Sequence, residues 1–125
     1  MKEIISVAIF GAIGALSRFG VGKGSKQLLG NDFPHETLIV NVVGCLIIGF
    51  VIQLSNRIAM PKHLETGLVV GFLGAFTTFS AFGYATFDLM KQGSLPTAIL
   101  NASLNLCLGL MAVWIGVVLA RIVSV

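Results

Sequence analysis

Long apolar runs separated by short polar segments dominate the chain. The runs cover residues 4–21, 37–54, 64–87 and 95–123, and each is close to the roughly 20 residues that a helix needs to cross a bilayer. Apolar and polar residues do not alternate with a period of two inside the runs, which argues against a transmembrane β-barrel. The pattern predicts an all-α integral membrane protein with four transmembrane helices.

Residues that begin or end helices stand between these runs. A glycine cluster at 20–24 ends the first run, and Asn31 or Asp32 is expected to cap the second, with Pro34 in its first turn. We expect one four-helix domain over residues 1–125, with spans at about 4–24, 35–56, 64–90 and 95–122. Because three more apolar runs follow the first, the first is expected to be a membrane helix and not a secretory signal.

The composition agrees with a membrane location. Hydrophobic residues make up 56% of the chain and charged residues only 10%, whereas a soluble domain carries about 25% charged residues. The mean hydropathy is +0.98. These values exclude an ordinary soluble domain and a disordered chain, and two cysteines inside apolar runs do not form a disulfide framework.

The basic residues divide evenly between the two sides of the membrane. Four spans place both termini on one face, so one side carries Lys2, Arg57, Lys62 and Arg121, and the other carries Arg18, Lys23, Lys26 and Lys91. Orientation normally follows an excess of Lys and Arg on the cytoplasmic side, and here there is no excess. The chain is therefore expected to insert in both orientations or to follow a weak local signal. Dual insertion would lead to an antiparallel homodimer.

Polar residues at the depth of the hydrocarbon are the candidates for function. They are Asn41 in the second run, Thr77, Thr78 and Ser80 in the third, and Asn101 and Asn105 in the fourth. An unpaired amide in hydrocarbon costs several kcal/mol, so these groups should face protein or water. Asn101 and Asn105 are four residues apart and lie on one helix face. Two interpretations stay open: contacts that hold helices together, or a polar path for an ion.

The charges near these groups favour an anion. No carboxylate is expected at mid-membrane, whereas a proton-coupled transporter usually has a titratable group at that depth. Neutral donors, a net charge of +3 and Arg18 near the end of the first run remain. Arg18 has a simpler alternative role as an interfacial residue whose side chain extends toward the headgroups.

The third run combines weak helix formers with aromatic side chains. Phe72, Phe76, Phe79 and Phe82 follow one another at steps of four, three and three, which predicts one phenylalanine stripe on a helix face. Two glycines and the Thr77–Thr78 pair weaken the helix there, and a break would free carbonyl oxygens that a cation satisfies well. Phenylalanine ring edges carry positive partial charge and can face an anion.

Four segments resemble the Fluc (CrcB-type) fluoride channels. They are GAIGALSRF at 11–19, NVVG at 41–44, GFLGAFTTFSAF at 71–82, and Asn101 with Asn105. The resemblance extends over the whole chain. Two positions depart from the family pattern: Ala75 replaces the second of a common glycine pair, and Asn105 stands where serine is frequent.

The resemblance implies a fluoride-specific channel that gives passive fluoride efflux and so reduces cytoplasmic fluoride toxicity. It also implies a multi-pass protein of the bacterial cell membrane, a dual-topology antiparallel homodimer, a third helix broken near its middle, and no nucleic-acid partner. Phe79, Phe82, Asn41, Ser80, Asn101, Asn105 and Thr78 would line the pore, and Arg18 would lie near the vestibule. The main-chain carbonyls of Gly74 and Thr77 would hold one structural Na⁺ that is not transported.

Other classes of function remain as alternatives. A small dual-topology secondary transporter of the multidrug-exporter type has a similar size and number of spans, although the missing mid-membrane carboxylate counts against it. A non-transporting assembly module would use the polar residues only for helix packing. An enzyme is not expected, because two separate cysteines and two histidines at span boundaries do not assemble a nucleophile, a base and an orienting group.

Overall fold

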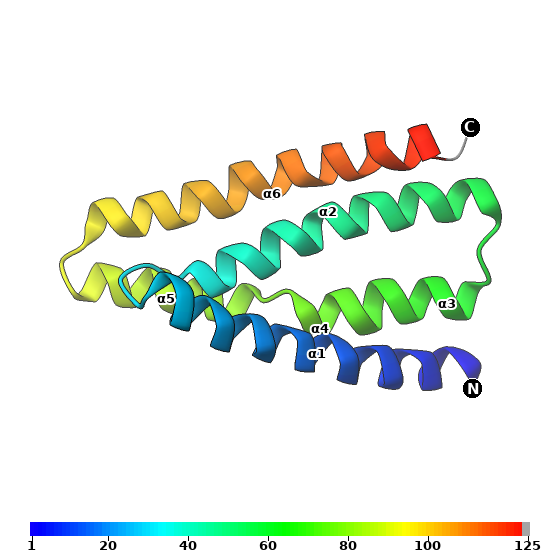
Figure 1. The fold of residues 1–125 in the computed structure, drawn as a ribbon, viewed down its shortest axis with the longest axis horizontal. Coiled ribbons are helices and arrows are strands. Elements are labelled where there is room, and N and C mark those ends of the chain that lie inside the picture. Colours follow the sequence, from blue (N-terminus) through cyan, green and yellow to red (C-terminus); the bar gives the residue numbers. More distant parts are fainter. Residues whose placement is uncertain (124–125) are drawn as a thin grey trace.

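The structure, a computed structural model, describes residues 1–123 as four long helical segments that run back and forth (Figure 1). The first, second and fourth segments are α1 (Lys2–Leu29), α2 (His35–Ile58) and α6 (Leu95–Val123). The third consists of α3 (Lys62–Thr66), the π-helix η1 (Gly67–Leu73), α4 (Gly74–Phe76) and α5 (Phe79–Lys91). Each segment is long and apolar enough to cross a membrane, so the prediction of four apolar helices is confirmed.

The connections lie at two opposite ends of the bundle. The α1–α2 and α5–α6 connections share one end, at the left of Figure 1, which we call the hairpin end (residues 30–34 and 92–94). The start of α1, the α2–α3 connection and the end of α6 lie at the other end. Adjacent segments therefore run in opposite directions.

Local sequence explains most helix boundaries. Gly30 follows α1 with φ 79° and Gly93 follows α5 with φ 77°, a conformation that glycine adopts without strain. The predicted cap of the second helix by Asn31 or Asp32 is wrong. α2 begins directly after Pro34 without a side-chain cap, and the Thr37 hydroxyl donates to the Pro34 carbonyl at 3.0 Å.

Close contacts at glycine bring the helices together. A Cβ on Gly116 of α6 would lie 2.1 Å from the Leu46 carbonyl oxygen of α2, and one on Gly49 of α2 would lie 2.3 Å from the Val113 carbonyl oxygen. The same holds between α1 and the third segment, where a Cβ on Gly14 would lie 2.2 Å from the main chain of η1. Small residues at such positions let membrane helices approach backbone to backbone.

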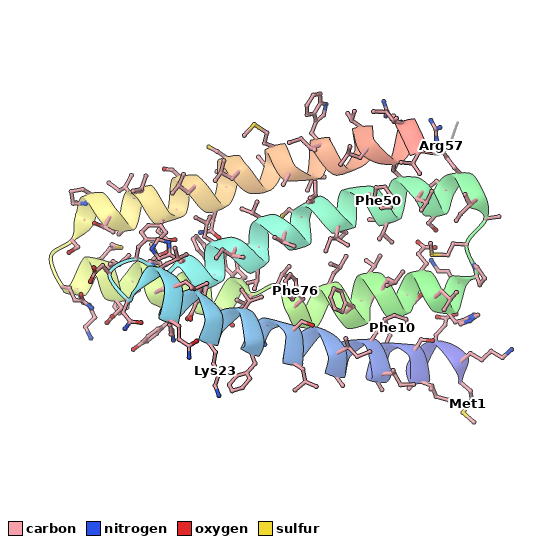
Figure 2. The ribbon with its side chains drawn as sticks, viewed as in Figure 1. Met1, Phe10, Lys23, Phe50, Arg57 and Phe76 are labelled. Atoms are coloured by element: carbon pink, nitrogen blue, oxygen red, sulfur yellow. The ribbon has the colours of Figure 1, made fainter. Side chains whose placement is uncertain are left out.

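The break at residues 77–78 divides the predicted phenylalanine stripe, so that prediction is wrong. Phe72 and Phe76 stack before the break with ring centroids 5.5 Å apart, and Phe79 and Phe82 form a second pair after it at 5.6 Å. Phe76 is 6% exposed and lies in the middle of the bundle, whereas Phe79 is 83% exposed (Figure 2). The two pairs point differently because the chain is extended between them.

Candidate functional site

The break in the third segment is the centre of the candidate site. Thr77 has φ −81° and ψ 163°, and Thr78 has φ −153° and ψ 117°, so both residues are extended. The Thr78 hydroxyl oxygen accepts from the Ala81 N–H at 3.1 Å and caps α5. The expected break is thus present, and the second half of the segment starts as a capped helix.

The side chain of Asn41 holds the break open. Its Oδ1 accepts from the Thr78 N–H at 2.9 Å, and its Nδ2 donates to the Thr78 carbonyl at 3.2 Å. In an uninterrupted helix the Thr78 N–H would instead donate to the carbonyl of Gly74. Asn41 therefore takes the place of Gly74 as the partner of the Thr78 N–H, and it gives the Thr78 carbonyl an additional donor.

The carbonyl groups of Gly74 and Thr77 are among those that lose their helical donors in this arrangement. The Gly74 carbonyl loses the Thr78 N–H to Asn41, and the Thr77 carbonyl loses the Ala81 N–H to the Thr78 hydroxyl. Arg18 Nη1 donates to the Thr77 carbonyl at 3.1 Å. Arg18 is thus a direct partner of the break, and its side chain is half-buried.

A chain of hydrogen bonds runs from Asn41 along α6 to α5. Asn41 Nδ2 donates to Asn105 Oδ1 at 2.9 Å, and Asn105 Nδ2 donates to Asn101 Oδ1 at 3.1 Å. Asn101 Nδ2 then donates to the Thr86 hydroxyl oxygen at 2.9 Å, and this hydroxyl donates to the Phe82 carbonyl at 2.8 Å. Each member donates in the same direction, which fixes the orientation of all three amides. Asn101 is completely buried.

Two hydroxyl groups and an aromatic pair lie on the α5 side of the break. The Thr78 and Ser80 hydroxyl oxygens are 3.4 Å apart, and either can be the donor. The two groups carry two hydrogens and use one between them, so one O–H is available for a further acceptor. Phe79 and Phe82 lie beside this pair, with their rings tilted by 53°.

A groove of 620 Å³ brings most of the predicted site residues together. Its lining includes Asn41, Gly74, Thr77, Thr78, Phe79, Phe82 and Asn105. Three predicted residues do not line this groove: Ser80, which is exposed, Asn101, which is buried behind Asn105, and Arg18, which lines a separate cavity.

Two residues contribute to the site although the sequence did not predict a role for them. Thr86 connects Asn101 to the Phe82 carbonyl, and no local motif marks it because its partner is 15 residues away. Gly44 lies against the break, and a Cβ there would come 2.1 Å from Thr77 Cγ2. Its spacing of three residues from Asn41 places both on one face of α2, which was a usable signal.

The carbonyl groups of Gly74 and Thr77 are also the candidate ligands of a cation. Hard cations prefer oxygen ligands, and carbonyls at a helix break are typical ligands of Na⁺ in membrane proteins. Among residues 1–123, no group of three or more His, Cys, Asp and Glu side chains could hold a metal ion. The oxygens present thus fit Na⁺ in chemistry, although Thr77 shares its carbonyl with Arg18.

Comparison with known proteins identifies the family. The family model described as CrcB-like protein, Camphor Resistance (CrcB), matches residues 5–117. The chain belongs to the CrcB family. CrcB proteins are not enzymes, and the expectation of a non-enzymatic membrane protein is confirmed.

Several CrcB relatives carry the name fluoride-specific ion channel FluC. The protein from Methylococcus capsulatus is 46% identical over 98% of this chain, and the chain spans 54% of that relative's length. The protein from Dehalococcoides mccartyi strain ATCC BAA-2100 is 44% identical over 99% of this chain and 96% of its own. The protein from Geobacter sulfurreducens is 41% identical over 97% of this chain and 98% of its own.

Proposed function

We propose that this CrcB protein is a fluoride-specific ion channel that lets fluoride leave a bacterial cell passively and so lowers fluoride toxicity in the cytoplasm. The observation that carries the proposal is the identity of 38–46% to relatives named as fluoride-specific ion channels. The chemistry of the break supports it.

The groups after the break suit an anion that has lost its water. Fluoride is small and strongly hydrated, so a selective path must offer donors and weak positive charge in place of water. The spare hydrogen of the Thr78–Ser80 pair is such a donor, and the edges of Phe79 and Phe82 carry positive partial charge. Both N–H groups of Asn41 are already engaged, so we assign Asn41, Asn105 and Asn101 to shaping the path.

The two halves of the broken segment have opposite electrostatic ends. The segment that ends at α4 presents carbonyl oxygens at the break, and α5 begins there with the positive end of its dipole, where the Thr78 hydroxyl already pairs the Ala81 N–H. Broken membrane helices use these two ends for cations and anions respectively. The arrangement therefore supports an anion path beside a cation site.

The acidic residues support a channel over a proton-coupled transporter. All five lie at or near helix ends or in a connection: Glu3, Asp32, Glu36, Glu65 and Asp88. Proton relays inside membranes use carboxylate or histidine side chains at depth. None of the five lies in the central part of a span.

An antiparallel dual-topology homodimer fits the surface of the single chain. The groove at the break is lined by the exposed Phe79 and by Gly74, whose carbonyl has lost its helical donor, and lipid cannot satisfy such a polar group. A second copy would cover the groove. Gly74 also lies there, and a Cβ on it would meet nothing of its own chain closer than 3.9 Å, so its own packing does not require glycine.

In this dimer, the Gly74 and Thr77 carbonyls of both copies would hold one structural Na⁺. The ion would supply positive charge to carbonyls that have lost their helical donors. Arg18 supplies part of this charge from the same chain through its bond to the Thr77 carbonyl. The Na⁺ would hold the two copies together and would offset the charge of the carbonyl oxygens, and it would do both while it stays bound.

Purified protein in liposomes should release fluoride about 100-fold faster than chloride. Internal KF or KCl, external impermeant anion and valinomycin allow both rates to be measured with ion-selective electrodes. Protein-free liposomes give the leak. Without valinomycin the fluoride efflux should stop, because a passive channel moves net charge. Equal fluoride and chloride rates, or efflux that continues without valinomycin, would contradict the proposal.

Sodium should raise the thermal midpoint of the detergent-solubilised protein by about 5 °C relative to potassium at equal ionic strength. A ligand that binds only the folded dimer stabilises it by mass action. The midpoint is measured by size-exclusion chromatography after heating, over a series of NaCl concentrations balanced with KCl. Identical midpoints in the two salts would remove the sodium site while leaving the channel proposal intact.

A further inference from the structure

Two cavities lie in series between the hairpin end and the break. The inner cavity has a volume of 320 Å³ and reaches Arg18 and Thr78. The outer cavity has a volume of 450 Å³ and is lined mainly by polar residues of the two connections and the adjoining helix ends. Among the residues that the structure describes, only Lys26 and Glu36 line both cavities.

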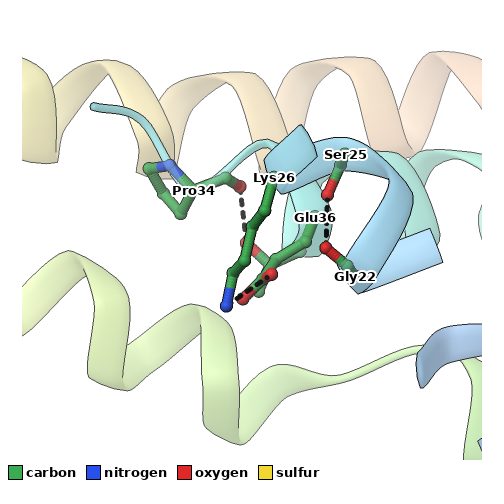
Figure 3. Close-up of polar contacts among 6 residues, drawn as sticks. Gly22, Ser25, Lys26, Pro34 and Glu36 are labelled. Atoms are coloured by element: carbon green, nitrogen blue, oxygen red, sulfur yellow. Dashed lines mark hydrogen bonds and ion pairs between the residues drawn. The ribbon is translucent and has the colours of Figure 1, made fainter. Parts of the chain in front are cut away.

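These two residues form an ion pair between α1 and α2. Lys26 Nζ lies 3.1 Å from Glu36 Oε2, and Figure 3 shows the two side chains directed toward each other. The neighbouring polar groups bind elsewhere: the Ser25 hydroxyl donates to the Gly22 carbonyl at 3.1 Å, and Lys23 Nζ lies 4.9 Å from the ring centroid of Phe19. Lys26 and Glu36 are therefore directed at each other and stand where the two cavities meet.

The pair also cancels one of the positive charges that line the inner cavity. Three cations line it, Arg18, Lys23 and Lys26, with one carboxylate, Glu36. Arg18 is engaged with the Thr77 carbonyl, and Lys26 is neutralised by Glu36. An anion that moves directly from the outer to the inner cavity passes the two residues that both cavities share and so comes near the Glu36 carboxylate. Because the Lys26 side chain is 59% exposed and that of Glu36 is 32% exposed, the pair is weak and can open.

We propose that the Lys26–Glu36 ion pair is an electrostatic partition between the two cavities and sets the rate at which anions reach the break. Glu36 slows the approach of anions, and Lys26 offsets this effect. The inference rests on the proposed channel function, because it assigns the two cavities to the fluoride path. The other role of such a pair is a simple link between α1 and α2.

Single substitutions separate these two roles. Glu36→Gln should increase the initial rate of fluoride efflux about threefold to tenfold, and Lys26→Gln should decrease it by a similar factor. A simple link predicts the same direction for both, since either variant removes the same contact. The exchanged variant Lys26→Glu with Glu36→Lys restores the pair and should return the rate to within about twofold of the original.

The efflux rate is measured at a low fluoride concentration and low ionic strength, because the entry of fluoride into the cavities then limits the rate. Both effects should shrink at about 0.5 M salt, because exposed charges are then screened. Glu65→Gln is the matched control: it breaks the Lys62–Glu65 pair (3.6 Å) at the opposite end of the same bundle. Elution volume and thermal midpoint confirm that every variant is folded.

The outcomes distinguish the inference from the function on which it rests. If the original protein conducts fluoride but Glu36→Gln and Lys26→Gln leave the rate unchanged or shift it in one direction, the partition is wrong and the channel stands. An original protein without fluoride efflux overturns the proposed function and the partition with it. Opposite shifts that disappear at high salt support the partition.

Discussion

Replacing Asn41 with leucine should lower fluoride efflux about 100-fold while the chain remains helical and inserted. Leucine fills a similar volume but offers no partner to the Thr78 N–H, to the Thr78 carbonyl or to Asn105. Each polar group left unsatisfied inside the bundle costs about 1–3 kcal/mol. The least costly response is for the Thr78 N–H to return to the Gly74 carbonyl, which closes the break and misplaces the groups that follow it.

The valinomycin-coupled efflux assay measures this loss, and circular dichroism checks the helix content. Asn56→Leu is the matched control, because Asn56 is an exposed residue of the same helix, outside the groove. It should leave efflux within about twofold of the original rate. If Asn41→Leu conducts as well as this control, the break does not depend on Asn41, and the residue has to be assigned another role.

Gly116→Ala should lower the thermal midpoint by about 10 °C or prevent purification of folded protein. The added Cβ would lie 2.1 Å from the Leu46 carbonyl oxygen and 2.8 Å from the Phe50 nitrogen. Both obstacles are backbone atoms, so no side chain can rotate away, and α6 must separate from α2. This separation would also strain the contact between Asn41 on α2 and Asn105 on α6.

Gly109→Ala is the control for this experiment. Gly109 is also buried in α6, but a Cβ there would lie 3.4 Å from Cys45 Sγ and meet no backbone atom that closely. Both variants replace glycine with a better helix former, so the gain in helix propensity cancels in the comparison. The midpoint of Gly109→Ala should stay within about 3 °C of the original. Equal losses for the two variants would show that backbone contact is not the cause.

Sequence patterns located the helices and the break because these depend on local composition. Apolar run length determines the spans, and two glycines beside two threonines weaken one helix. The prediction of one phenylalanine stripe was wrong because it also relied on local sequence alone. Extrapolating helical periodicity across Thr77–Thr78 ignores the change of direction that the break itself produces.

The hydrogen-bond partner of each polar residue could not be predicted from the sequence. Asn41 and Asn105 were both found, but their contact joins residues 64 positions apart and depends on how closely α2 and α6 approach. Nothing in the sequence near Thr86 indicates a role, because its hydroxyl accepts from Asn101 only once α5 packs against α6. The π-helix η1 was missed because it has the composition of an α-helix and differs only in its i→i+5 hydrogen bonds.

The amide chain between the break and α5 has a consequence for the energy supply of the cell. A proton relay needs groups that accept a proton on one side and release another, and membrane relays use carboxylates or histidines for this purpose. Here three carboxamides, those of Asn41, Asn105 and Asn101, are linked in sequence and locked in one orientation. We therefore expect this route to be tight to protons, so that a cell can discharge a toxic halide without dissipating its proton-motive force.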